Sequence, residues 1–146
     1  MYSLTTYWRL VIIVKKALST TKAPASAHSF SQGVHAGAIV QVSGQGPQDP
    51  DTGEYLYAGD VGRQTTRALE NVRAIVEASG ATFDDVISLR VYLTDQSYFS
   101  AMNDAYEAFV REHTPSGTLP ARTTVFVGLP WPQMLVEIDG MAVTGA

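Results

Sequence analysis

Residues 61–93 decide the fold; they read VGRQTTRALENVRAIVEASGATFDDVISLRVYL. Over residues 61–79, apolar and small side chains recur every three or four positions, which predicts an amphipathic helix. Asp60 is a suitable N-cap for this helix, and Gly80 is a suitable residue to end it. Over residues 86–93, apolar and polar residues alternate, which predicts a strand. The stretch therefore predicts a helix that packs on a sheet.

The flanking sequence extends this pattern to an α+β fold. Residues 24–36 are small and irregular and predict a loop, whereas residues 38–43 predict a strand. A second helix is expected from Asp95 or Ser97 to about His113. Two further strands are expected, over 123–127 and 135–143. We predict a single domain with a mixed β-sheet and two helices packed on one face.

Several apolar residues are expected to mark the strand faces. One face of the strand at 86–93 is expected to carry Ile87, Leu89, Val91 and Leu93. The sheet face away from the helices is expected to be partly apolar, on the evidence of Val40, Val42, Tyr92, Val125 and Val136. An oligomer that buries this face is the expected solution.

The composition excludes several classes of protein. The chain has 146 residues, a length typical of one domain, and 45% hydrophobic residues, which is typical of a folded chain. It has no cysteine, so it has no disulfide, thiolate nucleophile or cysteine-ligated metal. The net charge of -4 argues against a broad nucleic-acid-binding surface.

Residues 1–14 are treated as an N-terminal extension to a domain at 15–146. Their longest apolar run, residues 10–14, is far shorter than the roughly 20 residues of a membrane span. A mis-assigned start or a disordered extension is one interpretation, and a transit segment is another. We expect no contact with a membrane.

Familiar catalytic motifs are missing from the sequence. His28, His35 and His113 have no ligand-pair spacing, so no metal site is expected. No phosphate-binding glycine motif and no nucleophile elbow occur. Two charged residues in apolar strands remain, Arg122 and Glu137. One interpretation is that these two residues face solvent or form a structural ion pair with each other. The other interpretation is that they act on a substrate. In that case the arginine binds a carboxylate and the glutamate positions water.

Six segments, taken in order and spacing, resemble the Rid (YjgF) family of enamine/imine deaminases over about residues 15–143. They are SQGV at 31–34, VSGQ at 42–45, ALENVRAIVEASG at 68–80, NDAYEAF at 103–109, PARTTV at 120–125 and LVEID at 135–139. The resemblance implies a chorismate-mutase-like subunit and a homotrimer with active sites between subunits. It also implies hydrolysis of 2-imino or 2-enamino acids to 2-keto acids and ammonia without a cofactor. We expect a cytoplasmic enzyme with a small carboxylate substrate.

The resemblance also assigns roles to individual residues. Arg122 matches the arginine that binds the substrate carboxylate, and Glu137 matches the glutamate that orders the attacking water. Ser43 and Asn103 match polar residues near the site. The glycines Gly44 and Gly46 are expected where the chain approaches the ligand closely.

Two positions depart from the family pattern. Thr124 stands where well-known members carry cysteine, and Phe30 stands where they carry tyrosine. Both are still expected to line the substrate site, and the departures bear on the range of substrates more than on the reaction. Trp131 either narrows the pocket or is a surface aromatic.

Three alternatives stay open at this point. The chain could act on a related catabolic intermediate, or bind a keto acid as a non-enzymatic regulator. An RNA-cleaving activity is also attached to the family, but the acidic charge balance disfavours it.

Overall fold

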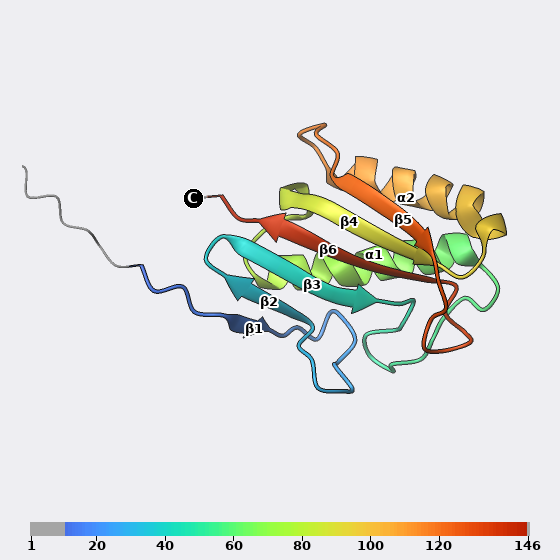
Figure 1. Cartoon of the computed structure of the whole chain (residues 1–146), viewed down its shortest axis with the longest axis horizontal. Coiled ribbons are helices and arrows are strands. Elements are labelled where there is room, and N and C mark those ends of the chain that lie inside the picture. The colour runs from blue at the N-terminus through green and yellow to red at the C-terminus, as the bar shows by residue number, and fades with distance from the viewer. Residues whose placement is uncertain (1–10, 146) are drawn as a thin grey trace, which may run out of the picture.

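Two helices cover one face of a six-stranded sheet (Figure 1). The computed structural model describes residues 11–145. Short 3-10 helices, η1 (Phe83–Asp85) and η2 (Gln96–Tyr98), precede β4 and α2. The main elements are β1 (Lys16–Leu18), β2 (Gly33–Ala36), β3 (Ile39–Gln45), α1 (Val61–Ala78), β4 (Val86–Leu93), α2 (Phe99–His113), β5 (Ala121–Phe126) and β6 (Val136–Val143).

The strand order is β1-β2-β3-β6-β4-β5, and only β4 and β5 run parallel. Helix α1 connects β3 to β4, and α2 connects β4 to β5. Both crossovers pass over the same side of the sheet, so the other side has no helix on it (Figure 1). The predicted α+β class, with a mixed sheet and two helices on one face, is confirmed.

Helix α1 forms as its sequence pattern predicts. The Asp60 side chain accepts a hydrogen bond from Arg63 N at 3.0 Å, and Gly80 follows the helix with a φ of 89°. The predicted apolar stripe is buried in full. Packing of this stripe on the sheet creates the core, because an amphipathic helix is stabilised mainly by burying its apolar face.

The second helix begins later than predicted. Asp95 caps η2 by accepting from Ser97 N at 2.8 Å, and α2 starts at Phe99. The later part of its apolar stripe is buried, but Phe99 at its start is 40% exposed. This leaves an exposed aromatic ring beside the edge strand β5.

The prediction of a continuous loop over 24–36 is wrong at its end. Residues 33–36 form β2, which pairs with β3, and β1 is a further strand that the sequence pattern did not indicate. A side chain at Gly33 would meet Ile75 at 2.8 Å and the Gln41 carbonyl at 2.9 Å. The small residue is therefore present because β2 packs closely against the core, and not because the chain forms a loop.

The face away from the helices is partly apolar, because the exposed Ile39 and Val143 lie on it, but most of the residues expected there are elsewhere. Val40, Val42 and Val136 are buried on the helix side, so only Tyr92 and Val125 of the proposed set lie on the open face. Ile87 also leaves its expected place and is 50% exposed, because the β4–β6 register shifts beside it. A bulge of this kind turns the following side chains to the other face.

Residues 1–10 of the predicted extension lie outside the described residues. Residues 11–14, which are described, are exposed and precede β1. Among the described residues, the helices are too short or too polar to cross a lipid bilayer.

Candidate active site

Arg122 lies at the sheet edge, on the side that the helices cover. In β5 it is in register with Leu89, which is fully buried on that side. Its Nη1 atom donates to Asn103 Oδ1 at 2.9 Å, and its Cζ atom lies 4.6 Å from the centre of the Tyr106 ring. Among residues 11–145 it forms no ion pair. Because only neutral groups hold this guanidinium, its charge is available to an anionic ligand.

A cavity of about 250 Å³ adjoins Arg122 between α2 and β5. The Tyr106 hydroxyl in its wall and the Thr124 hydroxyl two residues along β5 are buried, and neither has a hydrogen-bond partner in the described structure. Burial raises the pKa of Tyr106, while the nearby Arg122 charge lowers it. Buried hydroxyls are normally paired, so these two are exceptions within the described structure.

Glu137 points to the opposite side of the sheet. It is in register with Tyr92 of β4, and its neighbour Val136 is buried under the helices. Because successive strand residues alternate, the Glu137 side chain lies on the open face. It is half-buried, and this burial raises its pKa, as does the negative charge of Asp139 to a smaller extent.

Asp139 lies two residues after Glu137 on the same face and has its own partners. Arg90 Nε donates to Asp139 Oδ1 at 2.7 Å, and the Tyr92 hydroxyl donates to Oδ2 at 2.9 Å. Arg90 thus pairs with Asp139, whereas Glu137 has no ion pair within the described residues. The arrangement favours a Glu137 carboxyl that exchanges a proton more readily near neutral pH than an exposed glutamate does.

Glycines bring β3 close to Glu137. A side chain at Gly44 would overlap the Glu137 carboxylate, and one at Gly46 would lie 2.7 Å from Met134 Cε. A side chain at either position would therefore displace the end of a flexible neighbouring side chain, which glycine leaves in place. These contacts place Glu137 in a cavity of about 560 Å³ that includes both glycines, Phe30 and Met134 in its wall.

Ser43 joins β3 to the preceding segment through two hydrogen bonds. Its hydroxyl donates to the Ser31 carbonyl at 2.6 Å, and its backbone N–H donates to the Gln32 carbonyl at 2.9 Å. These bonds fasten the segment that carries Phe30 to β3. Phe30 itself is 52% exposed and faces the Glu137 cavity.

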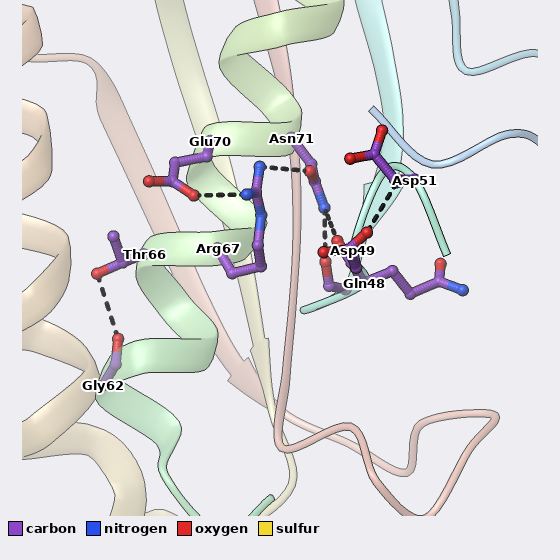
Figure 2. A network of polar contacts seen from close by, with 9 residues as sticks. Gln48, Asp49, Asp51, Gly62, Thr66, Arg67, Glu70 and Asn71 are labelled. Carbon is purple, nitrogen blue, oxygen red and sulfur yellow. Dashed lines mark hydrogen bonds and ion pairs between the residues drawn. The ribbon is translucent and has the colours of Figure 1, made fainter. Parts of the chain in front are cut away.

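A polar network anchors the far wall of the same cavity to α1 (Figure 2). The buried Asn71 side chain donates to the carbonyls of Gly46 at 3.2 Å and Gln48 at 3.0 Å. Its own oxygen accepts from Arg67 Nη2 at 2.9 Å, and Arg67 Nη1 lies 2.9 Å from a Glu70 oxygen. The turn after β3 is thus held to the helix by bonds that shape the cavity.

The predicted site residues therefore fall into two groups. Glu137, Gly44, Gly46 and Phe30 line one cavity, with Ser43 bonded beside it. Arg122 and Asn103 line the other, with Thr124 on the same side of β5. One chain does not bring Arg122 and Glu137 to a common cavity, because the sheet lies between them.

Among residues 11–145, no group of three or more histidine, aspartate or glutamate side chains could hold a metal ion. His113 stacks on Phe109, with ring centres 4.1 Å apart, and lies 2.9 Å from Arg73 Nη1. The contacts of this histidine are those of a packed side chain.

The comparison with known families gives a direct match. The family model described as Endoribonuclease L-PSP, which covers the YjgF and Rid proteins, matches residues 20–144. The chain belongs to this family. Membership agrees with the segments quoted above for the Rid resemblance.

Individual members of the family are similar over almost their whole length. The 2-iminobutanoate/2-iminopropanoate deaminase of Salmonella typhimurium is 41% identical over 130 residues, which cover 89% of this chain and 98% of that relative. The corresponding deaminase of Escherichia coli is 38% identical with the same coverage. The crystal structure of E. coli TdcF with bound serine superposes with a TM-score of 0.82 at 39% identity, covering 89% of this chain and 99% of TdcF.

Some residues in or next to the two cavities were not singled out from the sequence as site residues. Tyr106 is buried in α2 beside apolar residues, and nothing in the sequence shows that its hydroxyl is unpaired. Asp139 is different, because its position two residues after Glu137 in one strand already places both carboxylates on one face. Nothing in the sequence indicates the role of Asn71, because its side chain bonds to the carbonyl of Gly46, 25 residues earlier in the chain.

Proposed function

We propose that this protein hydrolyses reactive 2-imino and 2-enamino acids to 2-keto acids and ammonia. The observation that carries this proposal is the 41% identity, over nearly the whole domain, to a protein named as such a deaminase. The site supports it, because Arg122 offers an uncompensated guanidinium and Glu137 offers a half-buried carboxyl. These groups suit hydrolysis at a carbon that bears a carboxylate.

The reaction needs only positioning and proton transfer. Arg122 binds the substrate carboxylate through two parallel hydrogen bonds, and Glu137 orients a water molecule toward the imine carbon. The water oxygen bonds to that carbon while a proton reaches the nitrogen, which gives a carbinolamine. Glu137 then transfers the hydroxyl proton to the nitrogen. The C–N bond breaks, ammonia leaves with the electron pair, and the 2-keto acid remains.

We further propose that the active site forms between copies of a homotrimer, as the family resemblance implies. The separation of the Arg122 and Glu137 cavities on the two sides of the sheet supports a site shared by two chains. In such a trimer, the Arg122 side of one copy meets the Glu137 side of the next, and three identical contacts close the ring.

A coupled assay tests the reaction. An amino-acid oxidase generates the imine from an amino acid, and the decay of the imine is followed with and without the protein. We expect accelerated decay and matching release of ammonia. If the protein binds the keto acid but leaves imine decay unchanged, it is a ligand-binding regulator and not a deaminase.

Subunit complementation tests the shared site. Arg122→Ala and Glu137→Gln copies are each expected to be inactive when dissociated and reassociated alone. After equal mixing, random assembly gives one contact in about four with both residues intact, so activity returns to about a quarter of the wild-type level. Complete inactivity of an assembled mixture would show that each site lies within one chain.

The family description also names an endoribonuclease, and the same variants separate that activity. We expect no RNA cleavage, since the net charge of -4 disfavours binding to a polyanion. Cleavage that Arg122→Ala abolishes would instead assign the site to RNA.

A further inference from the structure

The walls of the Glu137 cavity include three aromatic side chains and one methionine. The cavity, of about 560 Å³, includes Phe30, Tyr55, Trp131 and Met134 in its lining. Phe30 is 52% and Trp131 49% exposed, so each presents a large apolar surface to the space beside Glu137. This surface is far larger than a methyl or ethyl side chain needs, because a small apolar group contacts only a few atoms of such a wall.

Two of the polar side chains of this cavity, Gln45 and Gln48, are used within the chain, whereas the buried Ser26 hydroxyl has no hydrogen-bond partner in the described structure. Gln45 Nε2 donates to the Ser43 carbonyl at 3.0 Å, and Gln48 Nε2 donates to the Gly53 carbonyl at 3.1 Å. The lining contains no lysine or arginine. Apart from His28, the cavity therefore offers no cationic side chain to a second anionic group of the substrate.

The aromatic wall is held in place from behind. Trp131 lies between two prolines, and its carbonyl accepts from Met134 N at 3.1 Å. The fully buried Gln64 of α1 donates to the Gln133 carbonyl at 2.9 Å and accepts from Leu135 N at 2.9 Å. These bonds hold the C-terminal end of the turn that carries Trp131, and the Val127 N–H, which donates to the Leu93 carbonyl at 2.8 Å, holds the other end. The wall is therefore preformed, and the entropic cost of binding against it is low.

We propose that this cavity receives the substrate side chain, and that the protein prefers 2-imino acids with aromatic side chains over those with methyl or ethyl side chains. This inference rests on the proposed deaminase function and adds its substrate class. Because Glu137 lines the cavity, the imine carbon that it acts on lies at the Glu137 end of the cavity. A phenyl or indole ring extending from that carbon then packs against Phe30 and Trp131, since aromatic rings favour offset or edge-to-face contact.

Competition between imines tests the preference. L-amino-acid oxidase generates imines from phenylalanine, tryptophan, alanine and 2-aminobutyrate, and kcat/KM is measured for each with the full-length protein. We expect the aromatic imines to be hydrolysed with at least about tenfold higher kcat/KM. Equal or faster hydrolysis of the small imines overturns this inference and leaves the proposed function standing. Failure with all four imines rejects the proposed function itself.

Substitutions in the wall assign the preference to Trp131. Trp131→Ala is expected to lower the aromatic-to-small ratio of kcat/KM about tenfold, whereas Trp131→Phe keeps most of it. Ile39→Ala is the matched control. Ile39 is 50% exposed, similar to Trp131, but it lies at the start of β3, whereas the cavity adjoins the end of that strand. An unchanged ratio in Trp131→Ala, or an equal loss for both classes of imine, contradicts the assignment. The Trp131→Phe ratio decides the case if Trp131→Ala does not fold.

Discussion

The Arg122 and Glu137 sides of the sheet differ in how each charge is held. Arg122 rests on neutral groups at an exposed edge, with Asn103 as its hydrogen-bond acceptor and an aromatic ring beside it. Glu137 is half-buried in a closely packed cavity next to a second carboxylate. The first arrangement suits binding of a substrate anion, and the second suits proton transfer. Under the proposed function, each side alone carries half of the hydrolytic site.

The largest effect is expected on the Arg122 side. Arg122→Ala removes two charge-assisted hydrogen bonds to the substrate, each worth about 1.5–3 kcal/mol, so kcat/KM falls by roughly 150-fold to 25,000-fold. The oligomer is expected to remain intact by size-exclusion chromatography. Arg73→Ala is the control, since Arg73 is paired with Glu77 on the surface of α1. Activity that survives in Arg122→Ala refutes the carboxylate clamp.

On the other side, Glu137→Gln should remove proton transfer and lower kcat by about 10²–10⁴. The same change is expected to stabilise the fold. The pKa of Glu137 is higher in the folded protein than in the unfolded chain. The folded protein therefore loses stability as the pH rises from the unfolded-state pKa through the folded-state pKa, because the carboxyl group ionises in a half-buried position. The variant should therefore show a higher Tm than the wild type at pH 7 and a smaller difference at pH 4. A lower Tm at pH 7 would contradict this account of the burial.

A smaller effect is expected from the glycine that adjoins Glu137. Gly44→Ala places a methyl group on the Glu137 carboxylate, which must shift, so kcat should fall about 10–100-fold with the fold retained. Gly62→Ala is a suitable control, because a methyl group there meets its neighbours at 3.6 Å or more. Equal activity of the two variants would show that the position of the carboxylate is unimportant.

The smallest expected effect concerns the pH dependence. The acidic limb of kcat/KM should reflect Glu137, whose pKa Asp139 raises further. Asp139→Asn removes that charge and leaves Arg90 without its partner, and both changes lower the pKa of Glu137. The acidic limb should therefore move to lower pH, whereas Asp51→Asn, at an exposed turn, leaves it in place. A shift to higher pH would show that another group controls the limb.

The helices were predictable because their signals are local. The α1 stripe repeats every three or four residues, and Asp60 and Gly80 bound it as expected. Strand β2 was not predictable from local sequence, because Gly33 owes its place to contacts with Ile75 and Gln41. The residues that share one face were predicted correctly only within the regular part of β4, where Leu89, Val91 and Leu93 are all buried. The bulge beside Ile87 and the pairing of β3 with β6 turned other apolar residues to unexpected sides.

By itself, the amino-acid sequence determined the α+β class, the family, and the two charged residues on which the proposed chemistry depends. It could do so because periodicity, capping and motif spacing are properties of neighbouring residues. The tertiary structure alone decided that Arg122 and Glu137 occupy opposite sides of one sheet. That outcome depends on strand register, which joins Leu89 to Arg122 and Tyr92 to Glu137 across long stretches of chain. Register is set by packing of the whole sheet, and a shift of one residue reverses the face of every side chain.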